Sequence, residues 1–259
     1  PEEEGGILNA YQLTNKFTSF QKIGKQSGFL FYTQAWNTSK IDPSTGFVNL
    51  FDTRYETREK SKMFFSKFDS IKYNKDKDWF EFIFDYTNFT TKAEGTRTQW
   101  TICSYGKRIE TLRDENQNSN WVSTEIDLTQ SFKNFFTKYG IDINDNLKEF
   151  IVQQDTSEFF KGILYLFKLT LQMRNSAIGK DIDYIISPIA DEKGIFYNSN
   201  ECDSSLPKNA DANGAYNIAR KGLYIVRKIK HSDELKNLNL AITNKEWLQF
   251  AQSKPYINK

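Results

Sequence analysis

The most informative stretch of the sequence lies near the end of the chain and reads Asn209-Ala210-Asp211-Ala212-Asn213-Gly214-Ala215-Tyr216-Asn217-Ile218-Ala219-Arg220. Apolar residues recur at helical spacing through and beyond it, at Ala212, Ala215, Tyr216, Ala219, Leu223, Ile225, Val226 and Ile229. Because Asp is favoured at helix starts, we expect Asp211 at the mouth of a buried helix over residues 211–230. The small residues around Gly214 would let that helix approach a sheet closely.

Asp211 has two interpretations at this point. A rigidly placed carboxylate is what a hydrolytic metal site needs, because Mg²⁺ is held by one or two carboxylates together with substrate phosphate. The alternative is an ordinary helix N-cap, and Asp211 taken alone favours that alternative.

Further stretches decide between them. They are Gly28-Phe29-Leu30-Phe31-Tyr32, Thr38-Ser39-Lys40-Ile41-Asp42-Pro43, Thr45-Gly46-Phe47-Val48, Leu171-Gln172-Met173-Arg174-Asn175-Ser176 and Asp183-Tyr184-Ile185-Ile186-Ser187-Pro188. Together with the Asp211 stretch, which resembles the third motif of RuvC-like nuclease domains, they resemble the type V-A CRISPR RNA-guided effector endonucleases. The stretches follow the family's order, and the resemblance covers essentially the whole chain.

The resemblance implies a domain organisation. Residues 1–34 resemble the end of RuvC segment II, residues 35–208 the inserted Nuc domain, and residues 209–259 RuvC segment III. The fold class is then α+β (mixed): an incomplete RNase H-like RuvC fold with an inserted mixed α/β Nuc domain. The chain also opens without Met, and we expect it to be the C-terminal portion of a longer enzyme.

Local patterns place the elements. We expect helices over 55–67, 126–138, 145–153, 155–173, 211–230 and 243–252. We expect strands over 29–32, 70–73, 79–86, 100–105, 108–112 and 183–186, a turn-rich loop over 37–46, and irregular chain over 188–209.

Composition sets limits on the interior and on partners. Of 259 residues, 38% are hydrophobic and 15% aromatic, with 22 Phe, so we expect a core rich in aromatic rings. The net charge is only +2, and nucleic-acid binding must therefore rest on a local cluster of basic residues.

Cysteine usage and hydropathy describe the setting. Cys103 and Cys202 form no CxxC motif, which argues against a disulfide framework and a cysteine-built zinc site and suggests a reducing, cytoplasmic location. No apolar run reaches membrane-spanning length, so we expect no membrane partner. The family resemblance makes that cytoplasm bacterial.

A second group of candidate residues surrounds Arg174. Its guanidinium follows an apolar helix and could bind a phosphate bidentately, with Asp183 orienting it through an ion pair. The alternative is a buried Arg–Asp pair that only ties the helix to the next strand, and spacing alone favours it. The resemblance instead implies that Arg174 and Asp183 line the Nuc side of the cleavage cleft, with Ser176 and Gln172 binding substrate nearby.

The resemblance implies a catalytic assignment. Asp211 matches the third of three RuvC carboxylates and would be a catalytic residue and a ligand of Mg²⁺, while Arg174 would act in catalysis without binding metal. The other two carboxylates belong to segments upstream, and we expect the isolated chain to be inactive. The partners implied are DNA target strands, a guide CRISPR RNA bound through the full-length protein, and the upstream RuvC segments.

Two functions therefore remain. The first is part of a Mg²⁺-dependent DNA endonuclease. The second is a non-catalytic single-stranded nucleic-acid or protein-binding module, which the near-neutral charge and the single matched carboxylate make credible for the isolated chain.

Overall fold

The computed structural model describes residues 35–93, 96–114, 120–202, 205–232 and 239–253. The helices are α2 (Arg58–Ser66), α3 (Leu128–Lys138), α4 (Leu147–Gln153), α5 (Ser157–Thr170), α6 (Ala210–Lys230) and α7 (Asn244–Gln252), with short 3-10 turns at Tyr86–Asn88 and Thr91–Ala93. The strands are β1 (Ser70–Asn74), β2 (Trp79–Asp85), β3 (Gln99–Cys103), β4 (Lys107–Asp114), β5 (Asn120–Asp127), β6 (Arg174–Ser176), β7 (Asp183–Ala190) and β8 (Phe196–Asn198). The fold is α+β, as the sequence predicts.

The largest sheet is antiparallel, with strand order β1-β2-β3. Its central strand β2 alternates strictly, with Phe80, Phe82 and Phe84 buried and the residues between them partly exposed. One face of a strand carries every second side chain, so this alternation gives the sheet one apolar face that needs covering.

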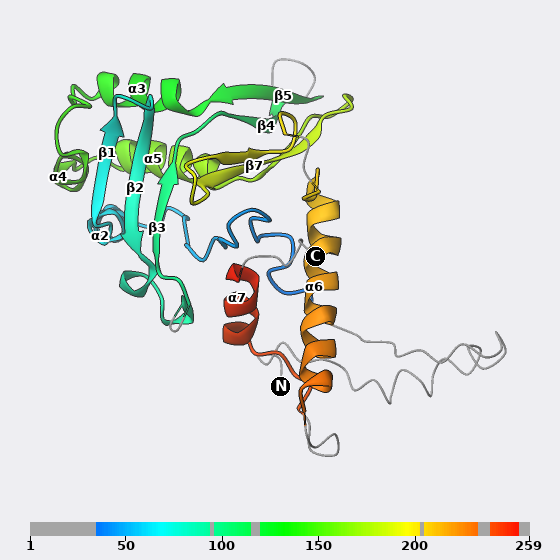
Figure 1. Cartoon of the computed structure of the whole chain (residues 1–259). Coiled ribbons are helices and arrows are strands. Elements are labelled where there is room, and N and C mark those ends of the chain that lie inside the picture. Colours follow the sequence, from blue (N-terminus) through cyan, green and yellow to red (C-terminus); the bar gives the residue numbers. More distant parts are fainter. Residues whose placement is uncertain (1–34, 94–95, 115–119, 203–204, 233–238, 254–259) are drawn as a thin grey trace.

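Helices α2, α3, α4 and α5 provide that cover (Figure 1). Phe132 of α3 packs on Phe80 and Phe82, and Phe167 of α5 lies 5.0 Å from the Phe82 ring centroid. Edge-to-face ring pairs recur throughout the layer, as expected for phenyl quadrupoles in a close-packed interior. The predicted aromatic core is confirmed.

Two smaller antiparallel units extend from this body. Strands β4 and β5 form a two-stranded ribbon, and β6, β7 and β8 form a three-stranded sheet. The β6–β7 hairpin packs on the ribbon through Ile109, Tyr184 and Ile186.

Helices α6 and α7 pack against the segment that precedes α2. Ile41 and Val48 of that segment share a small apolar cluster with Ile225 of α6 and Trp247 of α7. Gly46 makes the close approach possible: its φ of +74° is left-handed, and an added Cβ would lie 2.5 Å from the Ala251 carbonyl oxygen.

Several expected elements need correction. The chain over 120–127 is strand β5, whereas we expected loop up to residue 120 and helix from residue 126. Strand β6 follows the predicted helix over 155–173, in chain where we expected no strand. Strand β8 lies in the stretch over 188–209 that we expected to be irregular. The predicted strand over 29–32 and the domain boundary at residue 34 fall outside the described residues.

Within the described ranges, no helix combines the length and the apolar character needed to cross a bilayer.

Candidate functional site

The β6–β7 hairpin carries the Arg174 group. Arg174 pairs with Ile185 and Ser176 with Asp183 in the strand register. Directly opposed residues share a face and the face alternates along each strand, so Arg174, Ser176 and Asp183 lie on one side of the hairpin. The other side carries Asn175, which is buried and accepts a 2.8 Å hydrogen bond from the Ile109 backbone N–H.

The predicted ion pair of Arg174 and Asp183 is present, with Nε and Oδ1 3.7 Å apart. The two side chains are 53% and 33% exposed, so the pair is not the buried structural tie that spacing alone favoured. Surface pairs of this kind add little to stability. The guanidinium therefore remains accessible to a ligand.

Gln172 has a defined structural partner. Its Nε2 donates a 2.8 Å hydrogen bond to the Ile109 carbonyl oxygen and ties the end of α5 to strand β4. Its predicted contact with substrate stays a prediction.

Asp211 lies in the first turn of α6 rather than at the N-cap. The N-cap is Asn209, whose side chain accepts a 2.8 Å hydrogen bond from the Ala212 N–H. Asp211 is exposed, and its negative charge suits the positive end of the helix dipole. Because Asn209 already caps the helix, the N-cap interpretation does not account for Asp211.

The buried face of α6 is polar at its start. Asn213 Nδ2 donates to the Ile41 carbonyl oxygen at 2.8 Å, and Asn217 Nδ2 donates to the Thr38 carbonyl oxygen at 2.9 Å. Both asparagines are almost completely buried, and each spans a sequence separation of more than 170 residues. Residues four apart share a helix face, so these bonds fix the rotation of α6 about its axis.

One turn further along, Lys221 continues the same row. Its Nζ donates to the Trp36 carbonyl oxygen at 2.8 Å and lies over the Trp247 ring. Burial lowers the pKa of Lys221 to about 8. We call Asn213, Asn217 and Lys221 the polar ladder of α6.

Arg220 makes a second connection beside the ladder. Its Nη2 donates to the Ala251 carbonyl oxygen at 3.1 Å and to those of Phe250 and Ser253, at the end of α7. The last four carbonyls of a helix lack intrahelical partners, and the guanidinium reaches two of these in α7, those of Phe250 and Ala251.

These contacts correct one expectation. Arg220 and Lys221, which lie outside the predicted apolar stripe, are both buried. Of the predicted apolar stripe, Ile225 is buried, whereas Leu223 and Val226 are exposed. The amides satisfy backbone carbonyls inside, and part of the apolar stripe is left on the surface.

Asp42 joins the segment that accepts the ladder's hydrogen bonds to strand β7. Its buried carboxylate accepts hydrogen bonds from the Ser44 N–H at 2.9 Å and the Thr45 hydroxyl at 2.8 Å, and it contacts the Ser187 hydroxyl of β7. Burial raises the pKa of Asp42 above its ordinary value, against these hydrogen bonds. Residues 36–47 therefore connect α6 and β7 to one support.

The backbone of strand β7 also connects the hairpin to the chain that leads into α6. The Ile185 N–H donates to Ser199 Oγ at 2.9 Å, and Ser199 Oγ donates to the Lys208 carbonyl oxygen at 2.6 Å. Figure 1 shows α6 beginning beside this sheet. No ion pair joins Arg174 to Asp211 in the described part of the chain.

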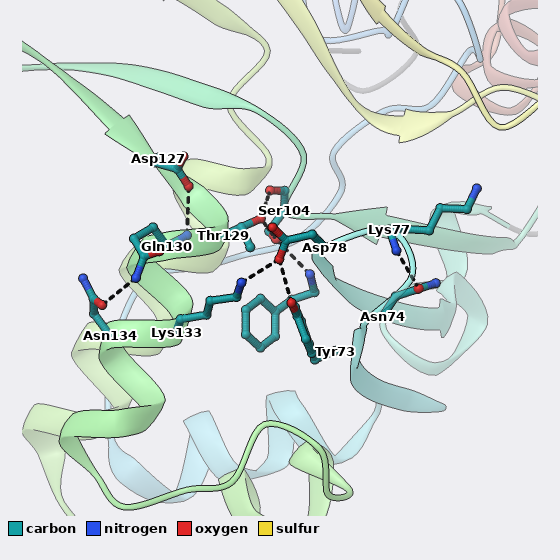
Figure 2. Close-up of polar contacts among 11 residues, drawn as sticks. Tyr73, Asn74, Lys77, Asp78, Ser104, Asp127, Thr129, Gln130, Lys133 and Asn134 are labelled. Atoms are coloured by element: carbon teal, nitrogen blue, oxygen red, sulfur yellow. Dashed lines mark hydrogen bonds and ion pairs between the residues drawn. The ribbon is translucent and has the colours of Figure 1, made fainter.

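A separate polar cluster ties α3 to the β1–β2 turn (Figure 2). Asp78 Oδ1 accepts hydrogen bonds from Lys133 Nζ and from the Tyr73 hydroxyl, both at 2.6 Å. Lys133, followed by Tyr73, lowers the pKa of the Asp78 carboxyl. The carboxylate is engaged with its own fold, and we assign it a structural role that the sequence did not indicate.

Metal-ligating groups are sparse in the described ranges. They contain no cluster of three or more His, Cys, Asp or Glu side chains able to hold an ion. Asp211 is a single exposed carboxylate, and a Mg²⁺ ion that keeps several waters would need only one or two such protein ligands.

The comparison with known families gives the identity of this region. The sequence model of the family described as NUC, nuclease domain, matches residues 41–201, more than half of the chain. The chain belongs to this nuclease-domain family, that of the Nuc domain in type V-A effectors, and it corresponds to their C-terminal portion. The Arg174 group lies inside the matched range, and Asp211 lies beyond it.

Proposed function

We propose that this chain is the C-terminal part of a CRISPR RNA-guided DNA endonuclease, completing a Mg²⁺-dependent RuvC cleavage site and positioning single-stranded DNA through its Nuc domain. The observation that carries the proposal is the exposed Arg174–Asp183 pair inside a nuclease-family domain, on the hairpin beside which α6 begins.

On the Nuc side, Arg174 would bind the phosphate next to the scissile bond. A guanidinium donates two parallel hydrogen bonds to phosphate oxygens, and its charge stabilises the transition state. Asp183 would hold the guanidinium plane, and Ser176, on the same face, would donate to a neighbouring phosphate or sugar. Gln172, whose side chain is held by the Ile109 carbonyl oxygen of β4, would act near the substrate strand.

On the RuvC side, Asp211 would supply one carboxylate to the metal site. When bound, the ion supplies an activated water and stabilises the leaving oxygen. The contribution of this chain is the position of that carboxylate, which the ladder of Asn213 and Asn217 fixes relative to residues 36–41. The remaining carboxylates would come from RuvC segments upstream of this chain.

The same segments would cover the exposed side of α6. Ile218, Leu223 and Val226 leave large apolar surfaces exposed along one helix, and such surfaces favour a packing partner. Guide RNA and target DNA would meet the chain only within the full-length protein, in the bacterial cytoplasm.

The test is cleavage of labelled single-stranded DNA with Mg²⁺, first by this chain and then by the chain joined to its upstream RuvC segments. We expect cleavage only from the joined protein and none from its Asp211→Ala variant. Cleavage by the chain alone, or by the joined Asp211→Ala variant at the parent rate, would contradict the assignment.

One observation favours the alternative of a non-catalytic binding module. The described residues offer a single candidate metal carboxylate, while α6 exposes apolar surface suited to a protein partner. Salt-sensitive DNA binding without cleavage by the joined protein would select this alternative.

A further inference from the structure

The β4–β5 ribbon exposes a tryptophan beside an arginine. Trp121 is 54% exposed, and the Arg113 guanidinium lies 5.1 Å from the centroid of its ring. The two residues are directly opposed in the ribbon register and share a face. An indole is a costly side chain to leave in water, because burying it would remove a large apolar area.

This pair adjoins the hairpin that carries the Arg174 group. The next pair on the same face, two residues along each strand toward the body, is Thr111 and Ser123. Their hydroxyls are 2.8 Å apart. Ser123 Oγ accepts a 3.0 Å hydrogen bond from the Ile178 N–H at the turn of the β6–β7 hairpin. The indole and the guanidinium therefore lie just past the tip of that hairpin.

The chemistry of this face fits an unpaired nucleotide. A base stacks on an exposed indole whatever its identity, and a guanidinium beside the ring adds cation–π contact and attracts phosphate. The turn of the β6–β7 hairpin, which is hydrogen-bonded to Ser123 through Ile178, also carries the exposed Lys180. On the same face, Glu125 is already paired with Lys107 at 2.6 Å, so it does not cancel the charge of Arg113.

We propose that Trp121 and Arg113 form a base-stacking platform for single-stranded DNA, which holds a nucleotide of the strand that passes around the hairpin tip from the Arg174 face. This inference rests on the proposed function and deepens it, because it assigns a second contact on the same strand outside the cleavage site. The occupant is an unpaired base with its phosphate.

The ribbon supplies a matched control on its other face. Leu112 is 58% exposed, is next to Arg113 in sequence, and pairs with Val122 on the face away from Ser123 and the hairpin. Removing Leu112 deletes a comparable exposed apolar side chain from the same strands without touching the platform.

The experiment is fluorescence anisotropy of the full chain with a fluorescein-labelled oligothymidine of about 16 nucleotides at low salt. We expect Trp121→Ala to weaken binding about tenfold or more, and Trp121→Phe to keep binding within a few-fold of the parent. Arg113→Ala should weaken binding and flatten its salt dependence. Leu112→Ala should bind like the parent.

An oligonucleotide of the same length with abasic positions separates stacking from general effects. The parent chain should lose affinity for the abasic strand, and Trp121→Ala should bind both strands equally. Equal binding of the two strands by the parent, or equal effects of Trp121→Ala and Leu112→Ala, would overturn the platform.

Folding and the proposed function are judged separately. Circular dichroism reports whether Trp121→Ala is folded. If it is not, two other results test the platform: the preference of the parent chain for the base-bearing strand, and DNA binding by the Trp121→Phe variant. A parent chain that does not bind the oligothymidine overturns the platform, whereas the cleavage assay on the joined protein decides the nuclease assignment independently.

Discussion

The aromatic body and the α6 region are held together by different physics. The body packs phenyl rings of β2 against rings from α2, α3 and α5, and almost all of these rings are buried. The α6 region has a small apolar cluster, buries the polar ladder, and exposes Leu223 and Val226. Undirected apolar packing gives the body its stability, whereas directed hydrogen bonds give α6 one defined orientation.

The difference has a functional meaning. Apolar contacts tolerate small sliding movements, but an amide that donates to one buried carbonyl fixes a helix rotation and register. Asp211 needs such a fixed position if it is to share a metal with carboxylates from other segments. The Nuc body needs only to present its hairpin and ribbon on a stable support.

The largest effect on stability is expected in the body. Phe68→Ala removes a fully buried ring that contacts Phe82, Phe84 and Phe167, and should lower the free energy of unfolding by about 3–5 kcal/mol. Urea unfolding measures it, with exposed Met63→Ala on α2 as the control at about 0.5 kcal/mol or less. Similar losses from both variants would mean that the rings are not the main support.

A smaller loss is expected in the ladder. Asn217→Ala leaves the buried Thr38 carbonyl without its donor and should cost about 1–3 kcal/mol. Hydrogen exchange should show faster opening of α6 and unchanged protection of β2. The neighbouring exposed-face variant Ile218→Ala should leave exchange in α6 unchanged, and equal effects of the two variants would count against a directed ladder.

Residues 36–47 contact both α6 and β7, and through Asp42 they should make the free energy of unfolding depend on pH. Its pKa is raised in the folded chain from 3.8, so between 3.8 and the raised value the unfolded chain is ionised while the folded chain keeps the proton. The stabilisation is complete below this window and is lost as pH rises through it. Asp42→Asn, which mimics the protonated form, should flatten that slope in thermal unfolding, and an unchanged slope would remove Asp42 as its source.

The smallest effect on stability is expected at the hairpin, where the effect on function should be large. Arg174→Ala removes an exposed ion pair and should change unfolding by less than about 1 kcal/mol. In the joined enzyme it should slow cleavage about a hundredfold while leaving target binding nearly unchanged. Parallel losses of binding and cleavage would instead assign Arg174 a general role.

Sequence patterns predicted the body better than the α6 contacts, for a physical reason. The alternation in β2 and the long periodicity of α5 report burial locally, so both elements were predicted. Strand β6 is only three residues long and begins soon after the end of α5, and β5 is a ribbon strand without strong apolar alternation. Such elements exist because of their tertiary partners.

The candidate site shows the same limit. The ion pair of Arg174 and Asp183 was predicted, and its exposure required the structure. The inward orientation of Asn217 and Lys221 depends on carbonyls of Thr38 and Trp36, far away in the sequence. Periodicity identified the apolar stripe of α6 but wrongly placed all of it inside. The orientation of the helix depends on distant carbonyls, which no local sequence pattern records.

Metal binding by the joined protein, measured as Mn²⁺ titration by electron paramagnetic resonance, tests directly whether Asp211 is a metal ligand. We expect a Mn²⁺ site in the parent that is lost in Asp211→Ala and retained in Asp145→Ala, a control carboxylate in the loop before α4. Equal Mn²⁺ binding by the parent and Asp211→Ala would contradict the claim that α6 carries a carboxylate of the cleavage site.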